Sequence, residues 1–288
     1  MRTVLSIAAA VLALGVLTRL MEGRLTYLPA RELFADPAAY GLRWTDVAIA
    51  AADGIRLHGW YCLPPEGTGH RADLIFFHGN AGNVSHRLIK IRSLAGLGLG
   101  VFIFDYRGFG RSGGRPGDAG ILEDARAAFR VFRENATPGR PLGIYGESIG
   151  CLPAVREAAA NPDAAFLVLE GSFPGKRAVV ARTPSLWPFY PFVSSTLDMG
   201  AHASRAVLPA LVMHAREDEV IPVALGRAVH QLLRGSVQLE WYEVPRGGHN
   251  DCYEVDGSFF PRIGAFLDRA LSRAAPGREP AAGAGHPG

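Results

Sequence analysis

The stretch Leu142-Gly143-Ile144-Tyr145-Gly146-Glu147-Ser148-Ile149-Gly150 decides the fold of this chain. Its first part is a short apolar run, typical of a buried strand, and its last part is a Gly-x-Ser-x-Gly pentapeptide. A strand that ends in this pentapeptide and continues into a helix forms a sharp turn, the nucleophile elbow, which raises the serine hydroxyl above the end of a sheet. Because a serine alone is a weak nucleophile, the pattern predicts a base and an acid further along the chain.

Short apolar runs alternate with helix-length segments along the rest of the chain. The runs lie at residues 74–77, 101–104, 142–145, 166–169, 211–213 and 239–244, after two strand-like segments, 47–51 and 55–62, that flank the hairpin signal Asp53-Gly54. The intervening segments 84–97, 118–133, 149–160, 223–233 and 259–270 are long enough for helices. The alternation predicts an α/β fold with a mainly parallel, twisted sheet of about eight strands and helices on both faces.

Two further polar residues follow later apolar runs. Asp218 comes after the run 211–213, and His249 comes after the run 239–244 on a glycine-containing loop. Ligands of such sheets bind at the carboxyl ends of the strands, so Ser148, Asp218 and His249 are predicted to meet at one edge. Their order along the chain is the order expected when a serine follows a nucleophile elbow. We therefore predict a catalytic triad of Ser148 as nucleophile, His249 as base and Asp218 as acid, with Glu170 as the alternative acid.

Such a triad also needs two backbone N–H groups that bind an oxyanion. One is predicted at Ile149, which follows the nucleophile at the start of a helix. The other is expected in the loop after the first long buried strand, His78-Gly79-Asn80-Ala81-Gly82-Asn83, where Asn80 is placed to present its N–H. Glu147, beside the nucleophile, is interpreted as a charge that favours the helix start.

Together these motifs resemble the α/β-hydrolase-fold serine hydrolases. Within that superfamily the chain is similar to the membrane-anchored α/β-hydrolase-domain group, which includes mammalian protein depalmitoylases, lysophospholipid or monoacylglycerol lipases, and bacterial homologues. The resemblance covers roughly residues 25–271. It also rests on Asp53-Gly54-Ile55-Arg56-Leu57-His58-Gly59-Trp60-Tyr61, on Asp105-Tyr106-Arg107-Gly108-Phe109-Gly110-Arg111-Ser112, and on the residues from Asp218 to Pro222 and from Gly247 to Asp251. It implies structural roles for Asp105 and Arg107.

One departure from the group concerns the residue after the pentapeptide. The group commonly has a second glycine there, whereas this chain continues with Cys151-Leu152-Pro153. Pro153 falls near the first turn of the helix, where a missing N–H is tolerated. The departure weakens the transfer of any particular substrate and leaves the chemistry intact.

The motifs and the resemblance predict a serine hydrolase that cleaves a lipophilic carboxylic ester or thioester through an acyl-enzyme. A serine aminopeptidase or amidase is the alternative enzyme, because a triad alone does not choose between esters and amides. A non-catalytic, membrane-associated binding protein on the same fold is the alternative from another class. No cofactor or metal is predicted, and the cysteines, which lack metal-ligand spacing, are interpreted as packed thiols at Cys62, Cys151 and Cys252.

The composition is that of an ordinary globular protein. Of the 288 residues, 48% are hydrophobic and 20% charged, which suits an α/β domain with a sizeable core. The formal net charge is +3 and the arginines are scattered, so a nucleic-acid partner is not expected. The expected partner is a small acyl ester or lipid-like substrate, and the sequence leaves the oligomeric state open.

The N-terminus carries an apolar run from residue 3 to residue 18, with Arg2 before it and Arg19 after it. A helix that also includes Leu20 and Met21 would be ~28 Å long, close to the ~30 Å hydrocarbon core of a bilayer. We therefore predict residues 1–24 to be a single-pass membrane anchor of undetermined orientation. A signal peptide that is cleaved on export and a buried helix are the alternatives.

Residues 25–273 are predicted to form the hydrolase domain, and residues 274–288, rich in Ala, Gly and Pro, a disordered tail. Within the domain, residues 173–207 separate two strands by more chain than a crossover needs, and they are rich in aromatic residues and proline. We interpret them as a short lid over the catalytic edge, with an insertion that serves packing alone as the alternative.

Overall fold

The computed structural model describes residues 26–193 and 196–274, together with residues 6, 13, 15–17 and 23. The strands within this part are β1 (Leu28–Pro29), β2 (Arg43–Ala50), β3 (Arg56–Leu63), β4 (Ala72–Phe77), β5 (Ala81–Gly82), β6 (Leu99–Phe104), β7 (Leu142–Glu147), β8 (Phe166–Glu170), β9 (Ala210–Ala215) and β10 (Leu239–Val244). The α-helices are α2 (Leu88–Gly96), α3 (Asp118–Asn135), α4 (Cys151–Ala160), α5 (Lys176–Arg182), α6 (Gly200–Ala203), α7 (Val223–Leu232), α8 (Cys252–Val255) and α9 (Phe259–Ala274). Short 3-10 helices are η1 (Pro37–Tyr40), η2 (Val84–Arg87), η3 (Ser148–Gly150) and η4 (Pro184–Phe192).

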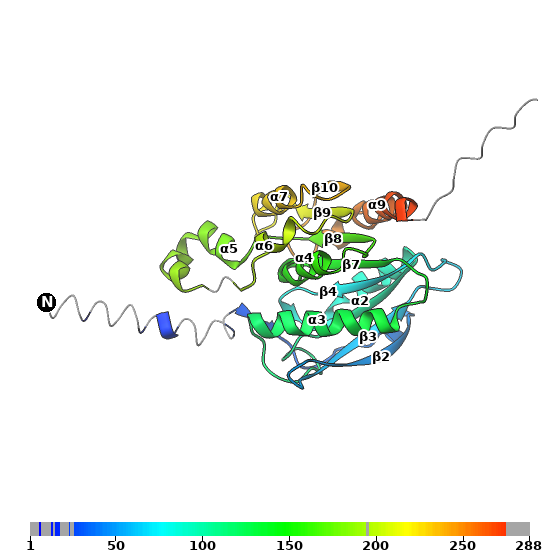
Figure 1. The fold of residues 1–288 in the computed structure, drawn as a ribbon, viewed down its shortest axis with the longest axis horizontal. Coiled ribbons are helices and arrows are strands. Elements are labelled where there is room, and N and C mark those ends of the chain that lie inside the picture. Colours follow the sequence, from blue (N-terminus) through cyan, green and yellow to red (C-terminus); the bar gives the residue numbers. More distant parts are fainter. Residues whose placement is uncertain are drawn as a thin grey trace, which may run out of the picture.

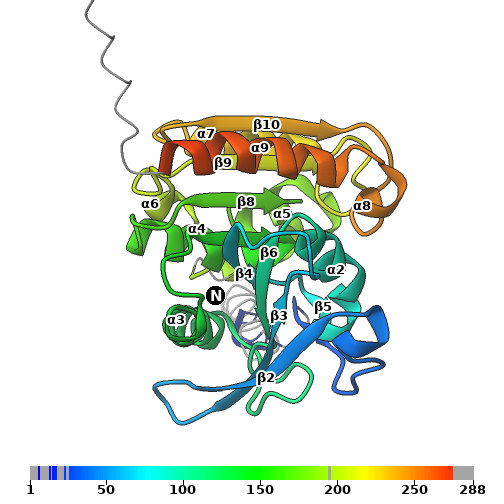
Figure 2. The same ribbon diagram turned by 90° about the vertical axis from the view of Figure 1, so that its right-hand side faces the viewer.

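The main sheet has eight strands in the order β10-β9-β8-β7-β4-β6-β3-β2, and Figure 2 shows it from β10 at the top to β2 at the bottom. Neighbouring strands from β10 to β6 run parallel, whereas β3 pairs antiparallel with β6 and with β2. The predicted mainly parallel sheet of about eight strands is confirmed. The predicted hairpin joins β2 to β3, and Gly54 in its turn has a φ of 81°, which favours glycine.

The two faces of the sheet bury different side chains, because successive residues of a strand point to opposite faces. In β4, Ile75 and Phe77 belong to one hydrophobic cluster with residues of α3, α4 and α7, whereas Leu74 and Phe76 belong to another with residues of α2 and α9. Helices therefore cover both faces, as predicted (Figure 1). The cysteines are buried free thiols, which confirms their interpretation: Cys62, Cys151 and Cys252.

Two predicted helices begin with a 3-10 turn. The predicted helix 84–97 starts as η2 and continues as α2, and the predicted helix 149–160 starts at Ser148 as η3 and continues as α4. In η2 the tight turn is fixed by Asn83, whose side-chain oxygen accepts the N–H of Ser85 at 3.0 Å. The turn of η3 places the first helical N–H groups directly at the carboxyl end of β7.

The segment 173–207 leaves the sheet between β8 and β9 and carries α5, η4 and α6 (Figure 1). An isolated bridge joins Gly175, just before α5, to Asp198, which precedes α6. The Lys176 ammonium at the start of α5 lies 2.7 Å from Asp118 Oδ2 at the start of α3, and ties the insertion to the domain. The role of this segment as a lid stays a prediction.

The predicted N-terminal anchor and C-terminal tail lie almost entirely outside the described residues. Of residues 1–24 the structure describes 6, 13, 15–17 and 23, and of residues 274–288 it describes 274. In the described part of the chain, no helix combines the length and the apolar character that crossing a membrane requires. The domain boundaries at residues 24 and 273 stay predictions.

Candidate active site

Ser148 stands at the junction of β7 and α4 with a φ of 52°, the one positive φ of a non-glycine residue among the described residues. Such a conformation costs roughly 1–3 kcal/mol and persists where the surroundings impose it. The two glycines of the pentapeptide allow the close packing around this turn. A Cβ on Gly150 would lie 2.1 Å from the carbonyl oxygen of Phe77, and one on Gly146 would lie 2.7 Å from the Cα of Cys151. The helix can therefore approach the strand ends only with glycine at both positions.

The structure brings the three predicted triad residues together. His249 Nε2 lies 2.9 Å from Ser148 Oγ, and His249 Nδ1 lies 2.7 Å from Asp218 Oδ2. Asp218 is on the loop after β9, and His249 is on the loop after β10. The second carboxylate oxygen of Asp218 accepts the N–H groups of Val220 at 3.0 Å and Ile221 at 2.6 Å. These bonds hold the carboxylate in one orientation toward the imidazole.

The charges of Asp218 and His249 stabilise one another. Burial by itself raises the pKa of Asp218, but hydrogen bonds from His214 and His249 outweigh it and hold that pKa well below its usual range. Burial lowers the pKa of His249, yet the hydrogen bond and the charge of Asp218 raise it above the ordinary 6.5. An ionised aspartate that increases the proton affinity of a histidine is suited to a general base.

The two predicted oxyanion donors have N–H groups available for a ligand. The backbone oxygen of Asn80 accepts the N–H of Leu28 at 3.4 Å, and its side-chain amide donates to the carbonyl oxygen of Thr26. The backbone N–H of Asn80 has no acceptor among the residues that the structure describes. Ile149 is the second residue of η3, and N–H groups in the first turn of a helix lack intrahelical partners.

Comparison with known proteins identifies the family. Residues 68–187 match the family described as serine aminopeptidase, S33. The human α/β-hydrolase domain-containing protein 17B is 32% identical over 203 residues, which cover 69% of this chain and 67% of the relative. The chain belongs to the α/β-hydrolase family.

This α/β-hydrolase has a second relative of similar length, an uncharacterized protein of Mycobacterium tuberculosis that is 34% identical over 86% of this chain and 88% of the relative. A solved Pyrococcus furiosus esterase superposes with a TM-score of 0.71 at 20% identity, over 85% of this chain and 98% of the esterase chain, which supports the fold. The fold and the family are those that the sequence motifs indicate, and the protein is a hydrolase.

His214 and Glu219 contact residues of the predicted triad, and sequence reasoning missed both. His214 Nε2 lies 2.8 Å from the carbonyl oxygen of Ile221 and 3.2 Å from Asp218 Oδ2. Glu219 Oε2 accepts the backbone N–H of His249 at 3.1 Å. His214 had one signal in the sequence, since it is the polar residue of the buried strand β9.

Two glutamates at the strand ends bind cations in place of His249. His249 pairs with Asp218, and Glu170, the alternative acid, instead binds the ammonium of Lys90 at 2.8 and 3.0 Å. The interpretation of Glu147 as a helix-start charge stays a prediction; Glu147 is the residue before η3, and its carboxylate makes no capping bond to it. Its oxygens accept hydrogen bonds from Lys90 and from the loop after β4.

Asp105 and Arg107 make the intramolecular contacts of structural residues. Asp105 Oδ1 accepts the N–H of Val84 at 2.9 Å, which fixes the start of η2. The Arg107 guanidinium lies 2.7 Å from Asp124 of α3 and 2.7 Å from Asp53 in the hairpin turn. Both residues therefore connect loops to the core, as the resemblance implies.

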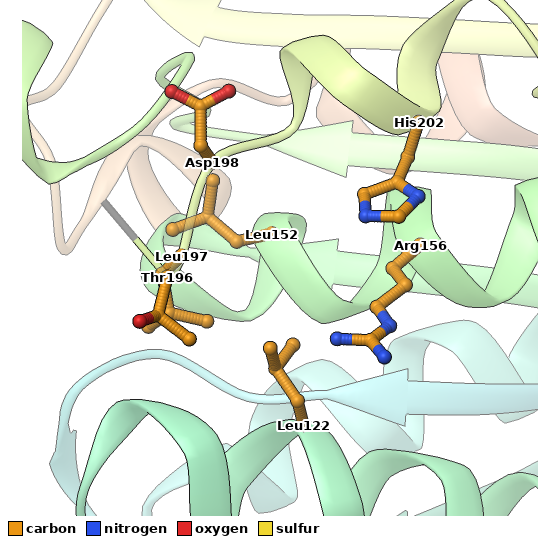
Figure 3. A pocket seen from close by; sticks show the side chains of 7 residues that line it. All are labelled: Leu122, Leu152, Arg156, Thr196, Leu197, Asp198 and His202. Carbon is orange, nitrogen blue, oxygen red and sulfur yellow. The ribbon is translucent and has the colours of Figure 1, made fainter. Parts of the chain in front are cut away.

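Two hollows elsewhere in the hydrolase do not contain the triad. Figure 3 shows a pocket of about 10 Å³, which has room for about one water molecule and is lined by Leu122, Leu152, Arg156, Thr196, Leu197, Asp198 and His202. A larger, open hollow of about 590 Å³ is lined by residues that precede β7, β8 and β9, such as Pro141, Ala165 and Pro209. It therefore lies at the amino ends of these strands, whereas Ser148, Asp218 and His249 follow carboxyl ends.

Proposed function

We propose that this hydrolase cleaves lipophilic carboxylic esters or thioesters through an acyl-enzyme on Ser148. The observation that carries the proposal is the continuous pair of contacts from Ser148 Oγ to His249 Nε2, 2.9 Å, and from His249 Nδ1 to Asp218 Oδ2, 2.7 Å. This arrangement makes a hydroxyl nucleophilic at neutral pH, because the proton has an acceptor within reach and the acceptor has a partner for its charge.

The proposed reaction has two half-reactions. His249 Nε2 takes the hydroxyl proton while Ser148 Oγ attacks the acyl carbonyl, and the resulting oxyanion accepts hydrogen bonds from the N–H groups of Asn80 and Ile149. The imidazolium then donates its proton to the leaving alkoxide or thiolate. Water, deprotonated by the same imidazole, attacks the acyl group and releases the acid. Asp218 stays ionised throughout and stabilises the imidazolium.

The Ser148→Ala variant tests the proposal in hydrolysis of p-nitrophenyl esters. We expect kcat/KM to fall by about 10⁴-fold or more, as for the loss of other triad nucleophiles. Undiminished turnover in Ser148→Ala would place the reaction elsewhere. A wild-type protein without esterase or amidase turnover would instead favour the alternative of a non-catalytic binding protein.

A lipophilic acyl group is supported by the composition of the insertion between β8 and β9. In η4, Leu186, Trp187 and Tyr190 are exposed, with 58% of Trp187 accessible to solvent. Exposed apolar side chains on a segment that starts at the carboxyl end of β8 suit contact with an acyl chain. We expect kcat/KM to rise with acyl-chain length across a series of p-nitrophenyl esters. A maximum at acetate would contradict the lipophilic assignment.

An aminopeptidase or amidase is the second candidate, and the description of the matching family favours it. Such an enzyme needs a free carboxylate near the triad for the substrate ammonium. Glu147 and Glu170 are neutralised by cations, so we assign this role to Glu219, which accepts the N–H of His249. A panel of aminoacyl p-nitroanilides, with Glu219→Gln as the matched variant, separates the two candidates. Faster turnover of these amides than of esters, lost in Glu219→Gln, would favour the peptidase.

We also propose that residues 1–24 anchor the protein to a membrane, with export after signal-peptide cleavage as the alternative. The support is the apolar run in the sequence, together with the position of one of its described residues, Gly15, close to the insertion. A Cβ on Gly15 would lie 2.5 Å from Cε1 of Phe192 in η4, and Val16 and Leu17 are exposed beside it. Fractionation of cells that produce the full-length protein tests the anchor. A soluble protein, or a mature N-terminus within residues 13–24, would contradict it.

A further inference from the structure

Four charged side chains, two of them buried and two partly buried, lie beside the strand end that precedes Ser148. Lys90 Nζ, from α2, lies 2.9 Å from Glu147 Oε1 and 2.8 and 3.0 Å from the two carboxylate oxygens of Glu170. Arg87 Nε lies 2.9 Å from Glu147 Oε2. Lys90 is only 2% exposed. We call Arg87, Lys90, Glu147 and Glu170 the Lys90 cluster; its two positive and two negative charges balance.

The residue types at these positions suit one ammonium shared by two carboxylates. Glu147 and Glu170 are the last residues of neighbouring parallel strands and lie opposite one another in register, so two carboxylates share one face of the sheet. Of the 30 Lys and Arg residues of the chain, only those at positions 90 and 176 are lysine. A compact ammonium can contact several carboxylate oxygens at once, whereas a planar guanidinium prefers one carboxylate. Lysine at position 90 therefore matches the pair of glutamates that it contacts.

The Lys90 cluster also holds the loop of Asn80 from both sides. Glu147 Oε2 accepts the N–H of Gly79 at 3.0 Å, and Arg87 donates to the carbonyl oxygen of Ala81 at 2.7 Å. Asn80 is the residue between these two contacts. Its N–H is the predicted oxyanion donor, and the Lys90 cluster therefore fixes the backbone directly before and after this donor.

His78 fixes the remaining degree of freedom, the rotation of the Gly79–Asn80 peptide. Its Nδ1 donates to the carbonyl oxygen of Gly79 at 2.8 Å, and this oxygen belongs to the same planar peptide unit as the N–H of Asn80. Burial lowers the pKa of His78 to about 4, so the ring is neutral and keeps its proton on Nδ1, because a carbonyl can only accept. In a trans peptide the N–H points opposite to the C=O, so the contact from His78 to the Gly79 oxygen also fixes the direction of the Asn80 N–H.

We propose that Glu147, held by Lys90 and Arg87, is a positioning residue that aims the backbone N–H of Asn80 at the oxyanion formed on the substrate. The inference rests on the proposed function. A donor that is already oriented stabilises the charge that develops in the transition state, and no reorganisation is needed during the reaction. The neutral ester in the ground state gains much less from the same donor, so loss of orientation affects kcat more than KM.

The test compares Glu147→Gln with Glu170→Gln in full-length protein with p-nitrophenyl butyrate. Each variant removes one carboxylate charge from the Lys90 cluster, but only Glu147 contacts the Asn80 loop. We expect Glu147→Gln to lower kcat roughly 10- to 100-fold, less than the complete loss of an oxyanion donor, with KM within about 2-fold. Glu170→Gln should lower kcat by less than about 5-fold.

Phenylboronic acid supplies a readout that a merely structural role would not move, because its tetrahedral serine adduct places an oxygen where the oxyanion forms. We expect its Ki to rise in Glu147→Gln by about the factor by which kcat falls, and to change little in Glu170→Gln. If Glu147→Gln does not fold, Arg87→Lys keeps the cation and shortens the reach to Ala81. That variant should lower kcat about 3- to 10-fold at constant KM.

Equal effects of the two glutamine variants on kcat and on the boronate Ki would overturn the positioning role. So would unchanged kinetics in Arg87→Lys. A wild-type protein that lacks turnover dependent on Ser148 would contradict the proposed function, and this inference with it. Turnover that depends on Ser148, together with equal glutamine variants, would contradict this inference alone.

Discussion

Replacing Lys90 with methionine removes the ammonium that Glu147 and Glu170 share. Glu147 keeps Arg87 and the N–H of Gly79, whereas Glu170 keeps no cation within the Lys90 cluster and retains the hydroxyl of Tyr145. Breaking a buried ion pair in this way costs about 3–5 kcal/mol, because one charge stays buried without a counter-charge. For a domain of this size, each kcal/mol lowers Tm by about 2–4 °C, so we expect a decrease of roughly 6–20 °C.

The loss of stability should depend on pH. In the wild type, burial tends to raise the pKa of Glu147, but the charges of Arg87 and Lys90 outweigh it and hold that pKa well below the ordinary 4.5. The stabilisation is therefore present above pH 4.5 and is lost as the pH falls toward the lower folded pKa. Lys90→Met removes one of the two cations that lower the pKa of Glu147, so less of this stabilisation remains in the variant. The difference in unfolding free energy between wild type and variant should thus be larger at pH 6 than at pH 3.

Urea unfolding at the two pH values measures both effects. The double variant Lys90→Met/Glu170→Gln is the matched control, because it also removes the carboxylate left without a cation. We expect the double variant to recover at least about half of the lost free energy. The reasoning is refuted if Lys90→Met costs less than about 1 kcal/mol, or if the double variant is less stable than the single one.

Three further predictions concern the elbow, the histidine and the insertion. Gly150→Ala should lower the free energy of unfolding by about 3 kcal/mol or more, because its Cβ would lie 2.1 Å from a backbone oxygen. The control Gly257→Ala, whose Cβ would have nothing within 4 Å, should be nearly neutral in urea unfolding, and equal stability of the two variants would contradict the packing explanation. The raised pKa of His249 places the acid limb of the kcat/KM profile above pH 6.5, because the base must be neutral to accept a proton. Asp218→Asn should move this limb to lower pH and lower kcat about 10⁴-fold. A limb that does not move would belong to a group other than His249. Trp187→Ser should slow hydrolysis of esters carried in phospholipid vesicles more than hydrolysis of soluble butyrate esters, and equal effects on both would argue for a packing role alone.

The parts of the structure that follow from periodicity could be predicted from the sequence. Continuous apolar runs such as that of β4 indicate strands buried on both faces, and the Gly-x-Ser-x-Gly turn places Ser148 at a strand end. Because strand ends of a parallel sheet share one edge, Asp218 and His249 could be placed beside it without distances. These predictions succeed because the local sequence patterns favour the same strands and turns that the complete fold contains.

The contacts around the triad could not be predicted, because they join residues that are far apart in the chain. Glu147 looked like a helix-start charge, since its partner Lys90 is 57 residues away and the register of β7 with β8 was unknown. One signal was present: a lysine in the apolar surroundings Leu88-Ile89-Lys90-Ile91 is rarely buried unless it is paired with an acid. His214, in the middle of an apolar strand, carried the same kind of signal.

That Ser148 is the nucleophile is tested most directly by labelling the purified protein with a fluorophosphonate and mapping the modified peptide by mass spectrometry. The triad geometry predicts one stoichiometric adduct on the peptide that contains Ser148, at a rate that falls steeply in His249→Ala. Labelling should be absent in Ser148→Ala. An adduct on another residue, or equal labelling of wild type and Ser148→Ala, would contradict the assignment of Ser148.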